Sequence, residues 1–245
     1  MDAELIGLAQ AYLERRGAGG VDGPDSIAAT PRWSLDWDEA YCRRVADHFE
    51  RAPLFACDST LSGWYDRFKQ ENLQQYQLVL DAGITVEPWR GPGQPYRGSA
   101  ELRAAVRNSG VLQVYLTSSG HGTEPAPQEH PMLAPSSVEA GGVPFTHNDV
   151  FRAVHDIFGH VMFGHDFSPR GEFRAAFAHL RLYPAVVHPV LFTEHLAQVC
   201  WFFFGPHAGE GRYPPQKVVR LPESLLDSFR GLFRFDGQGH FNKVW

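Results

Sequence analysis

Two histidines, His155 and His160, are the residues whose type and spacing most directly suggest chemistry in this chain, and Asp156, two apolar residues and Gly159 separate them. Two neutral imidazoles suit Fe, Zn, Cu or Ni better than Mg or Ca. In an ideal helix, residues five apart point about 140° away from each other, so both can bind one ion only if the helix is distorted. A π-turn near Gly159, which has no Cβ to clash, would supply that distortion.

The segment around the two histidines has the signals of an amphipathic helix. Thr146 and Asp149 form a capping-box pattern, and apolar residues then recur at helical spacing, which predicts a helix over 147–164. Asp156 lies four residues before His160 and is expected to accept a hydrogen bond from its second ring nitrogen, which would fix the tautomer of a ligand.

A later predicted helix, 189–204, is apolar around most of its circumference, yet Glu194 and Gln198 stand one turn apart on it. Such a helix is normally buried, and a carboxylate is almost never buried without a cation. The cation could be a metal ion or an arginine. With His155 and His160, Glu194 would complete the two-histidine, one-carboxylate triad that leaves positions on Fe(II) for oxygen and substrate. The prediction is therefore iron held by these three residues, with Gln198 close to the reacting groups.

Other polar residues are candidates for supporting roles. On the predicted helix 171–183, Glu172 and His179 could support the ligands through hydrogen bonds, line the substrate site or bind a second metal ion. Arg152 is either solvated or binds a substrate carboxylate. A substrate-binding wall is predicted from Arg152, Tyr183 and Trp201. Two further histidines are expected to have no catalytic role, His165 as the end of a helix and His130 as a solvated loop residue.

The segment from His155 to His160 resembles the metal-binding His-acidic-x-x-Gly-His segment of the pterin-dependent aromatic amino acid hydroxylases. The resemblance implies a mostly helical catalytic core with a small sheet, the use of Fe(II), O2 and tetrahydropterin to hydroxylate Phe, Tyr or Trp, and iron binding by both histidines. In that family the third ligand is a Glu just after a Trp-Phe pair. Here Trp201-Phe202 is followed by Phe203-Phe204-Gly205, and Glu194 precedes the pair instead. The stretch 148–221 also resembles a group of uncharacterised bacterial and phage proteins, which implies no activity.

Composition indicates a single domain. With 245 residues, 43% of them apolar, the chain can bury a sizeable core. The net charge is −6, and the sequence contains no run of basic residues that would favour binding to nucleic acid or to a membrane surface. Three well-separated cysteines suggest no disulfide framework, and no apolar run reaches a membrane span of about 20 residues. A cytoplasmic protein is expected, and the composition leaves its oligomeric state open.

The expected fold class is mainly α (α+β), one helical domain with a small β element. Residues 1–30 are expected to form an N-terminal helix and a flexible connection, followed by a catalytic domain over 31–245. Gly- and Pro-rich residues in 118–146 predict a long loop, a possible lid over the site. The remaining predicted elements are helices over 36–51, 60–81 and 99–108 and from about 222, and strands over 84–89 and 111–117.

The leading functional hypothesis is a mononuclear non-haem Fe(II) monooxygenase that hydroxylates a small aromatic or amino-acid-derived substrate with O2. One alternative is a zinc hydrolase, in which Glu172 or Glu194 acts as general base on a metal-bound water. A second is a dinuclear iron oxygenase that also uses Glu172 and His179. A third is a non-catalytic helical binding protein whose polar residues form buried hydrogen-bond networks.

Overall fold

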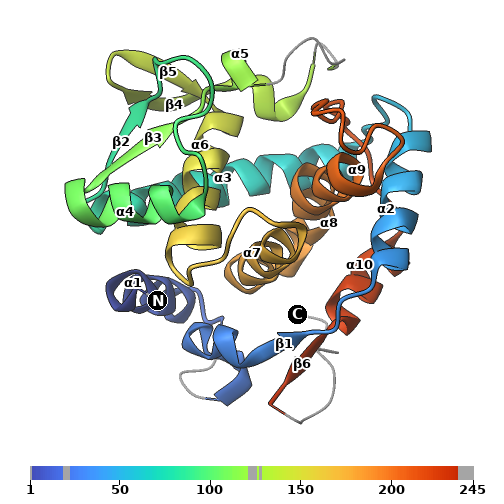
Figure 1. Cartoon of the computed structure of the whole chain (residues 1–245), viewed down its shortest axis with the longest axis horizontal. Coiled ribbons are helices and arrows are strands. Elements are labelled where there is room, and N and C mark those ends of the chain that lie inside the picture. The colour runs from blue at the N-terminus through green and yellow to red at the C-terminus, as the bar shows by residue number, and fades with distance from the viewer. Residues whose placement is uncertain (1, 19–22, 121–125, 127–128, 237–245) are drawn as a thin grey trace.

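The structure is a computed structural model that describes residues 2–18, 23–120, 126 and 129–236. In this part of the chain, helices pack around a central helix, α7 (Pro169–Leu182), and three two-stranded sheets lie towards the periphery (Figure 1). The expectation of a mainly helical α+β fold is confirmed.

The expected helices are present, with ends that differ by a few residues. The regular ones are α1 (Ala3–Arg15), α2 (Glu39–Arg51), α3 (Ser59–Asp81), α4 (Ser99–Ser109), α7 and α10 (Glu223–Gly231). Two helical stretches change their winding midway: α6 (His147–Val154) continues as the π-helix η4 (His155–Val161), and α8 (His188–Leu191) continues through the π-helix η6 (Phe192–Ala197) into α9 (Gln198–Phe204). Short helical turns are α5 (Thr117–Gly120), η1 (Gly23–Asp25), η2 (Ile27–Arg32), η3 (Pro131–Leu133) and η5 (Ala185–Val187).

Each sheet joins two strands. The two predicted strands are confirmed as β2 (Thr85–Pro88) and β3 (Val111–Val114), which pair in parallel with α4 as the crossover. Near the two ends of the chain, β1 (Trp33–Leu35) pairs antiparallel with β6 (Phe233–Phe235).

The prediction of an irregular loop over 118–146 is wrong for its second half. There β4 (Pro135–Ala140) and β5 (Val143–Thr146) form an antiparallel hairpin. Its turn contains Gly141 (φ 54°) and Gly142 (φ 72°), and two consecutive positive φ angles are typical of the tight turns that glycine permits. Residues 121–125 and 127–128 lie outside the described residues, so the lid stays a prediction.

The N-terminal helix belongs to the main core. Leu5, Ala9 and Leu13 are buried in it, and the hydroxyl of Tyr12 donates a hydrogen bond to Glu71 of α3 (2.5 Å). Residues 23–32 form short helical turns, and the predicted flexible connection otherwise falls on 19–22, outside the described residues.

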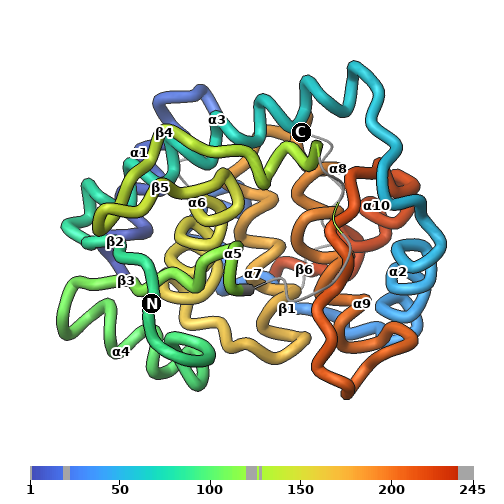
Figure 2. The backbone as a smooth tube through the Cα atoms, turned by 90° about the horizontal axis from the view of Figure 1, so that it is seen from above, coloured from blue at the N-terminus to red at the C-terminus, as the bar shows by residue number. Residues whose placement is uncertain are grey.

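The continuous helix α6–η4 lies between α3 and α7 (Figure 2). Its π-helical part carries both candidate histidines. The predicted capping box is confirmed, because Thr146 and Asp149 each bind the other's backbone NH, so the helix begins where the sequence indicated. Among the described residues, no helix combines the length and apolar character needed to cross a membrane.

Acid stability should depend on His188, which is buried at the start of α8. Its Nε2–H donates to the Tyr183 carbonyl (3.0 Å), and its Nδ1 accepts from Arg230 (2.9 Å), so only the neutral tautomer fits. Burial, and then the charge of Arg230, lower the pKa of His188 from 6.5 to about 4. Protonation therefore favours the unfolded chain, and the stability that the neutral ring contributes is complete above about pH 6.5 and is lost as the pH falls towards 4.

We expect His188→Gln to remove about 3 kcal/mol of the acid-induced loss of stability, since each pKa unit corresponds to about 1.4 kcal/mol. Urea unfolding at pH values between 7 and 4 measures this directly. Variant and wild-type stability curves that stay parallel over this range would contradict the assignment.

Candidate metal centre

The helix that carries His155 and His160 is wound as a π-helix over His155–Val161, with the Met162 NH bonded to the Ile157 carbonyl five residues earlier (2.8 Å). The wider turn brings the two imidazoles to the same side, with their Nε2 atoms 3.0 Å apart. The predicted distortion is confirmed.

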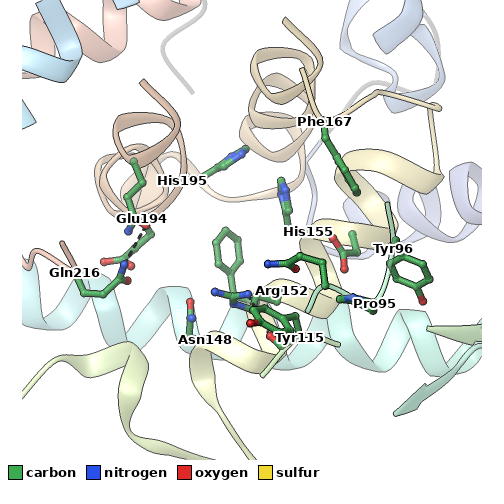
Figure 3. Close-up of a pocket in the computed structure, with 14 residues that line it drawn as sticks. Pro95, Tyr96, Tyr115, Asn148, Arg152, His155, Phe167, Glu194, His195 and Gln216 are labelled. Atoms are coloured by element: carbon green, nitrogen blue, oxygen red, sulfur yellow. Dashed lines mark hydrogen bonds between the residues drawn. The ribbon is translucent and has the colours of Figure 1, made fainter. Parts of the chain in front are cut away.

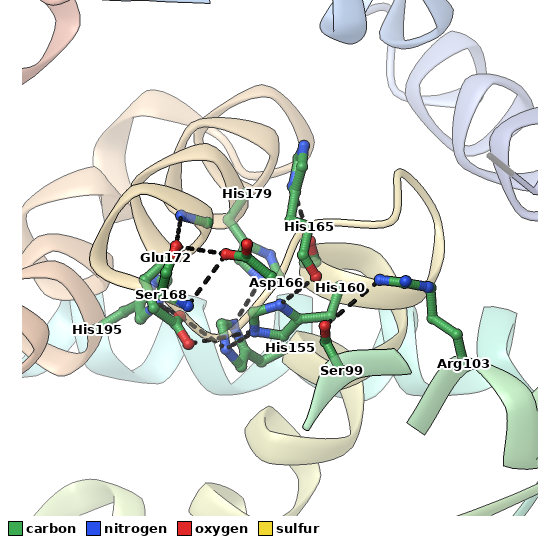
Figure 4. A network of polar contacts seen from close by, with 12 residues as sticks. Ser99, Arg103, His155, His160, His165, Asp166, Ser168, Glu172, His179 and His195 are labelled. Carbon is green, nitrogen blue, oxygen red and sulfur yellow. Dashed lines mark hydrogen bonds and ion pairs between the residues drawn. The ribbon is translucent and has the colours of Figure 1, made fainter. Parts of the chain in front are cut away.

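Two further side chains meet the histidine pair (Figure 4). Glu172, in the first turn of α7, places its carboxylate oxygens 3.5 Å from Nε2 of His155 and 3.5 Å from Nε2 of His160. His195, on the second π-helix, places its Nε2 3.0 Å from Glu172 Oε2. His155, Glu172 and His195 each offer one ligand atom within 4.8 Å of the others.

This donor set fits a transition-metal ion. Two ligand atoms that each lie about 2.1 Å from one ion are separated by roughly 3.0 to 3.4 Å, close to the separations found here. Nδ1 of His160 donates to the His165 carbonyl (3.2 Å), so its Nε2 presents a lone pair to the cluster. Two imidazole lone pairs facing each other repel unless a cation or a proton lies between them. Imidazole and carboxylate together are ligands typical of iron and zinc.

The charges of the cluster are coupled. Burial alone would raise the pKa of the Glu172 carboxyl, but the surrounding histidines hold that pKa well below its usual range. Burial, followed by the His195 ring, lowers the pKa of His155 to about 3. Burial opposes a charge on His160, but Glu172 outweighs it and raises the pKa of this ring. At neutral pH the cluster therefore contains a carboxylate and neutral His155, the forms that bind metal.

The imidazole rings of His155 and His160 are oriented by contacts at their Nδ1 atoms, on the side away from the cluster. Nδ1 of His155 lies 3.1 Å from Nε2 of His179 on α7, and with a metal at His155 Nε2 the first nitrogen would be the donor. His165 lies at the turn after the helix, as expected, and its Nδ1–H donates to the Gly159 carbonyl (3.0 Å). The backbone of His165 therefore orients His160, a role that the sequence had suggested for Asp156.

Glu194 does not join the histidine pair. Its carboxyl group accepts a hydrogen bond from Tyr65 of α3 and lies 3.6 Å from Nε2 of His130. Burial raises the pKa of Glu194 to about 8. The structure thus gives this buried acid a hydrogen-bonding partner where the sequence predicted a metal ion. The expectation that His130 is solvated is wrong, because its side chain is fully buried.

A cleft opens beside the cluster (Figure 3). One cavity of about 250 Å³, the polar cavity, has several polar side chains among its lining residues, and a second of about 340 Å³ is largely apolar. Both cavities reach His155 and His195, and both are bounded by Arg152, Glu194 and Gln198. The polar walls include Tyr96, Tyr115, Asn148, Asp156 and Gln216, and the apolar walls include Val199, Phe202, Phe203 and Pro214.

The predicted substrate-binding residues divide into two groups. Arg152 lines the cleft, whereas Trp201 and Tyr183 do not: Trp201 donates to Glu50 (2.5 Å), and the Tyr183 hydroxyl bonds to Asn72 in the core. Gln198 faces both cavities, where its Oε1 accepts from Gln216 (3.3 Å).

Sequence reasoning missed His195, and it considered Glu172 as a supporting residue, a general base or a ligand of a second metal ion but not as a partner of the histidine pair. One signal was available for His195, which is a further polar residue beside Glu194 and Gln198 on a mostly apolar helix. In regular α-helical geometry it would point about 100° away from Glu194, so the two residues had to serve different sites. The winding of η6 places His195 at the cluster and Glu194 next to α3.

Comparison of the chain with known protein families, with curated protein sequences and with solved structures found no match. The geometry of the cluster and of its cleft is therefore the basis for a functional proposal.

Gly159 has a packing role that its replacement should reveal. A Cβ there would lie 3.1 Å from His155 Nδ1, 3.1 Å from His179 Nε2 and 3.2 Å from the Ala175 Cβ. We expect Gly159→Ala to push η4 away from α7, with a loss of about 1–3 kcal/mol in stability and roughly tenfold weaker metal binding.

Gly63→Ala is the matched control, because Gly63 is exposed within α3 and a Cβ there meets nothing within 4 Å. Thermal unfolding and metal titration of both variants provide the measurement. Equal metal affinity in the two variants would show that the close approach at Gly159 does not matter for the centre.

Proposed function

We propose that the protein is a mononuclear non-haem iron oxygenase that hydroxylates a small molecule with O2. His155, His160, His195 and Glu172 would hold the iron. The observation that carries the proposal is the convergence of three imidazole Nε2 atoms and one carboxylate beside a cleft. The His-acidic-x-x-Gly-His spacing, which resembles that of the aromatic amino acid hydroxylases, agrees with it.

Iron suits the number and placement of the ligands. An octahedral ion bound by four side chains keeps positions for O2 and for substrate, whereas a four-coordinate zinc ion would be closed. The solvent exposure of the proposed ligands also agrees with access of O2 and substrate from one side. The His160 side chain is 1% exposed, whereas those of His155 and Glu172 are 17% and 13% exposed. When bound, iron would supply the redox chemistry that activates O2.

The surrounding residues would prepare the site. His179 orients the His155 ring, while Phe202 and Phe203 keep one side of the cleft apolar and limit the access of water. Asp156 lines the polar cavity, and burial raises its pKa to about 6, so it can exchange a proton with a bound molecule near neutral pH. Only the motif resemblance supports tetrahydropterin as a cosubstrate.

Zinc hydrolysis is the second candidate, and the third imidazole favours it. Three histidines are a common ligand set of catalytic zinc, in which a water molecule takes the fourth position. Glu172 would then be a general base rather than a ligand. A dinuclear iron site has less support, because His179 Nε2 faces the Nδ1 of His155 instead of a second position near Glu172.

Metal analysis and oxygen uptake test the function. Protein purified without added metal and then loaded anaerobically with Fe(II) should bind one iron per chain and consume O2 in the presence of substrate, with pterin and 2-oxoglutarate supplied in separate trials. Stoichiometric zinc, together with no response to Fe(II) and O2, would favour the hydrolase instead.

A pair of isosteric variants tests which carboxylate is the ligand. We expect Glu172→Gln to weaken iron binding by more than about tenfold. Loss of a residue that only hydrogen-bonds to a metal ligand already costs about that much, and loss of a ligand should cost more. Glu194→Gln should bind iron like the wild type, because its amide can still meet Tyr65. Iron titration with a chelator competitor measures both affinities. Loss of iron from the Glu194 variant alone would support the triad expected from the sequence.

A further inference from the structure

Arg152 places a half-buried guanidinium in the cleft, 6.0 Å from the centre of the Tyr115 ring and without an ion pair to any described side chain. It lies one turn before His155 on α6 and borders both cavities (Figure 3). Its one hydrogen bond within the described structure runs from Nη1 to the Tyr115 carbonyl (3.2 Å), and no described carboxylate forms an ion pair with it. Burial lowers the pKa of Arg152, but arginine stays charged at any pH at which the protein is folded.

The nearby acids do not provide a direct partner. Asp149 and Asp156 are close enough to favour the charged guanidinium. Asp149, however, uses one oxygen for the Thr117 NH (2.6 Å) and the other for the Thr146 NH (2.8 Å). Because the half-buried guanidinium of Arg152 loses part of its hydration and gains no bonded anion in return, its remaining donors form a ready site for an anionic group.

We propose that Arg152 anchors the carboxylate of the substrate, and that the substrate is a monocarboxylic acid with an apolar body. A planar carboxylate matches the guanidinium fork. A dianion such as a phosphate monoester is disfavoured because Arg152 is the one arginine or lysine among the described residues that line the two cavities, and the Asp156 carboxyl lines the first of them. The apolar body would occupy the second cavity against Val199, Phe202 and Phe203, and both cavities reach the candidate metal ligands His155 and His195.

This inference rests on the proposed function only for the statement that the bound acid is a substrate. Binding itself depends on Arg152 and on the apolar wall, so it can be measured apart from turnover. The probes are 3-phenylpropanoate, its neutral amide 3-phenylpropanamide, and acetate, titrated calorimetrically into the full chain with and without iron.

The acid should bind roughly 10- to 100-fold more tightly than its amide, the range expected for hydrogen bonds to a charged group. Arg152→Gln should abolish this preference, and Arg152→Lys should restore part of it. Arg174→Gln is the control for net charge, since Arg174 is exposed on α7, and it should behave like the wild type. Acetate should bind more weakly than 3-phenylpropanoate, and Phe203→Ala should reduce that difference.

Different results separate this inference from the function. Equal affinity for acid and amide, or no binding of any probe, overturns the inference. Acid binding that requires iron and is unchanged in Arg152→Gln also overturns it, because the acid would then be a metal ligand. Arg152-dependent acid binding in a protein that takes up no iron and consumes no O2 supports the anion site and contradicts the oxygenase.

Discussion

The candidate site depends on one contact, the 3.0 Å approach of the Nε2 atoms of His155 and His160. A regular α-helix would point these rings apart, and the π-helix over His155–Val161 brings them together. That winding leaves backbone at Gly159 close to α7, where a side chain would press on the His155–His179 contact. A capped start at Thr146 and the turn to His165 stabilise the two ends of the same segment.

A second π-helix has the complementary role. On η6, neighbouring residues serve different surroundings: His195 faces Glu172, while Glu194 bonds to Tyr65 and lies next to His130. Each π-turn replaces regular α-helical hydrogen bonds, and both π-turns occur where the helix contributes histidine side chains to the cluster. Local departures from the α-helix at functional sites are a recurrent feature of proteins. The centre thus depends on the coincidence of two unusual turns.

Much of the fold could be predicted from the sequence. The helix start at Thr146 and the strands that became β2 and β3 have local causes, namely a cap and an alternating apolar pattern. The π-helical winding of η4 could be predicted because two histidines five residues apart can face one ion only if the helix is distorted. The hairpin after Pro135 was missed because its Gly141–Gly142 turn lies in a segment rich in loop-forming residues.

The carboxylate that meets the histidine pair could not be identified from the sequence because its position depends on packing between distant segments. Glu194 had the sequence signature of a ligand, a carboxylate on an apolar helix, but α3 offers it the Tyr65 hydroxyl. Glu172 lies near the exposed start of α7, where an acid commonly interacts favourably with the helix dipole, so its type and position alone did not single it out as the partner of the histidine pair. Only the packing of α7 against η4 brings its carboxylate to the histidines.

The most direct measurement is anomalous diffraction at the iron absorption edge from crystals of the Fe(II)-loaded protein. The account predicts one peak per chain, within bonding distance of His155, His160 and His195 Nε2 and of the Glu172 carboxylate. A peak bound by Glu194 in place of Glu172, or protein that binds no iron at these histidines, would contradict it.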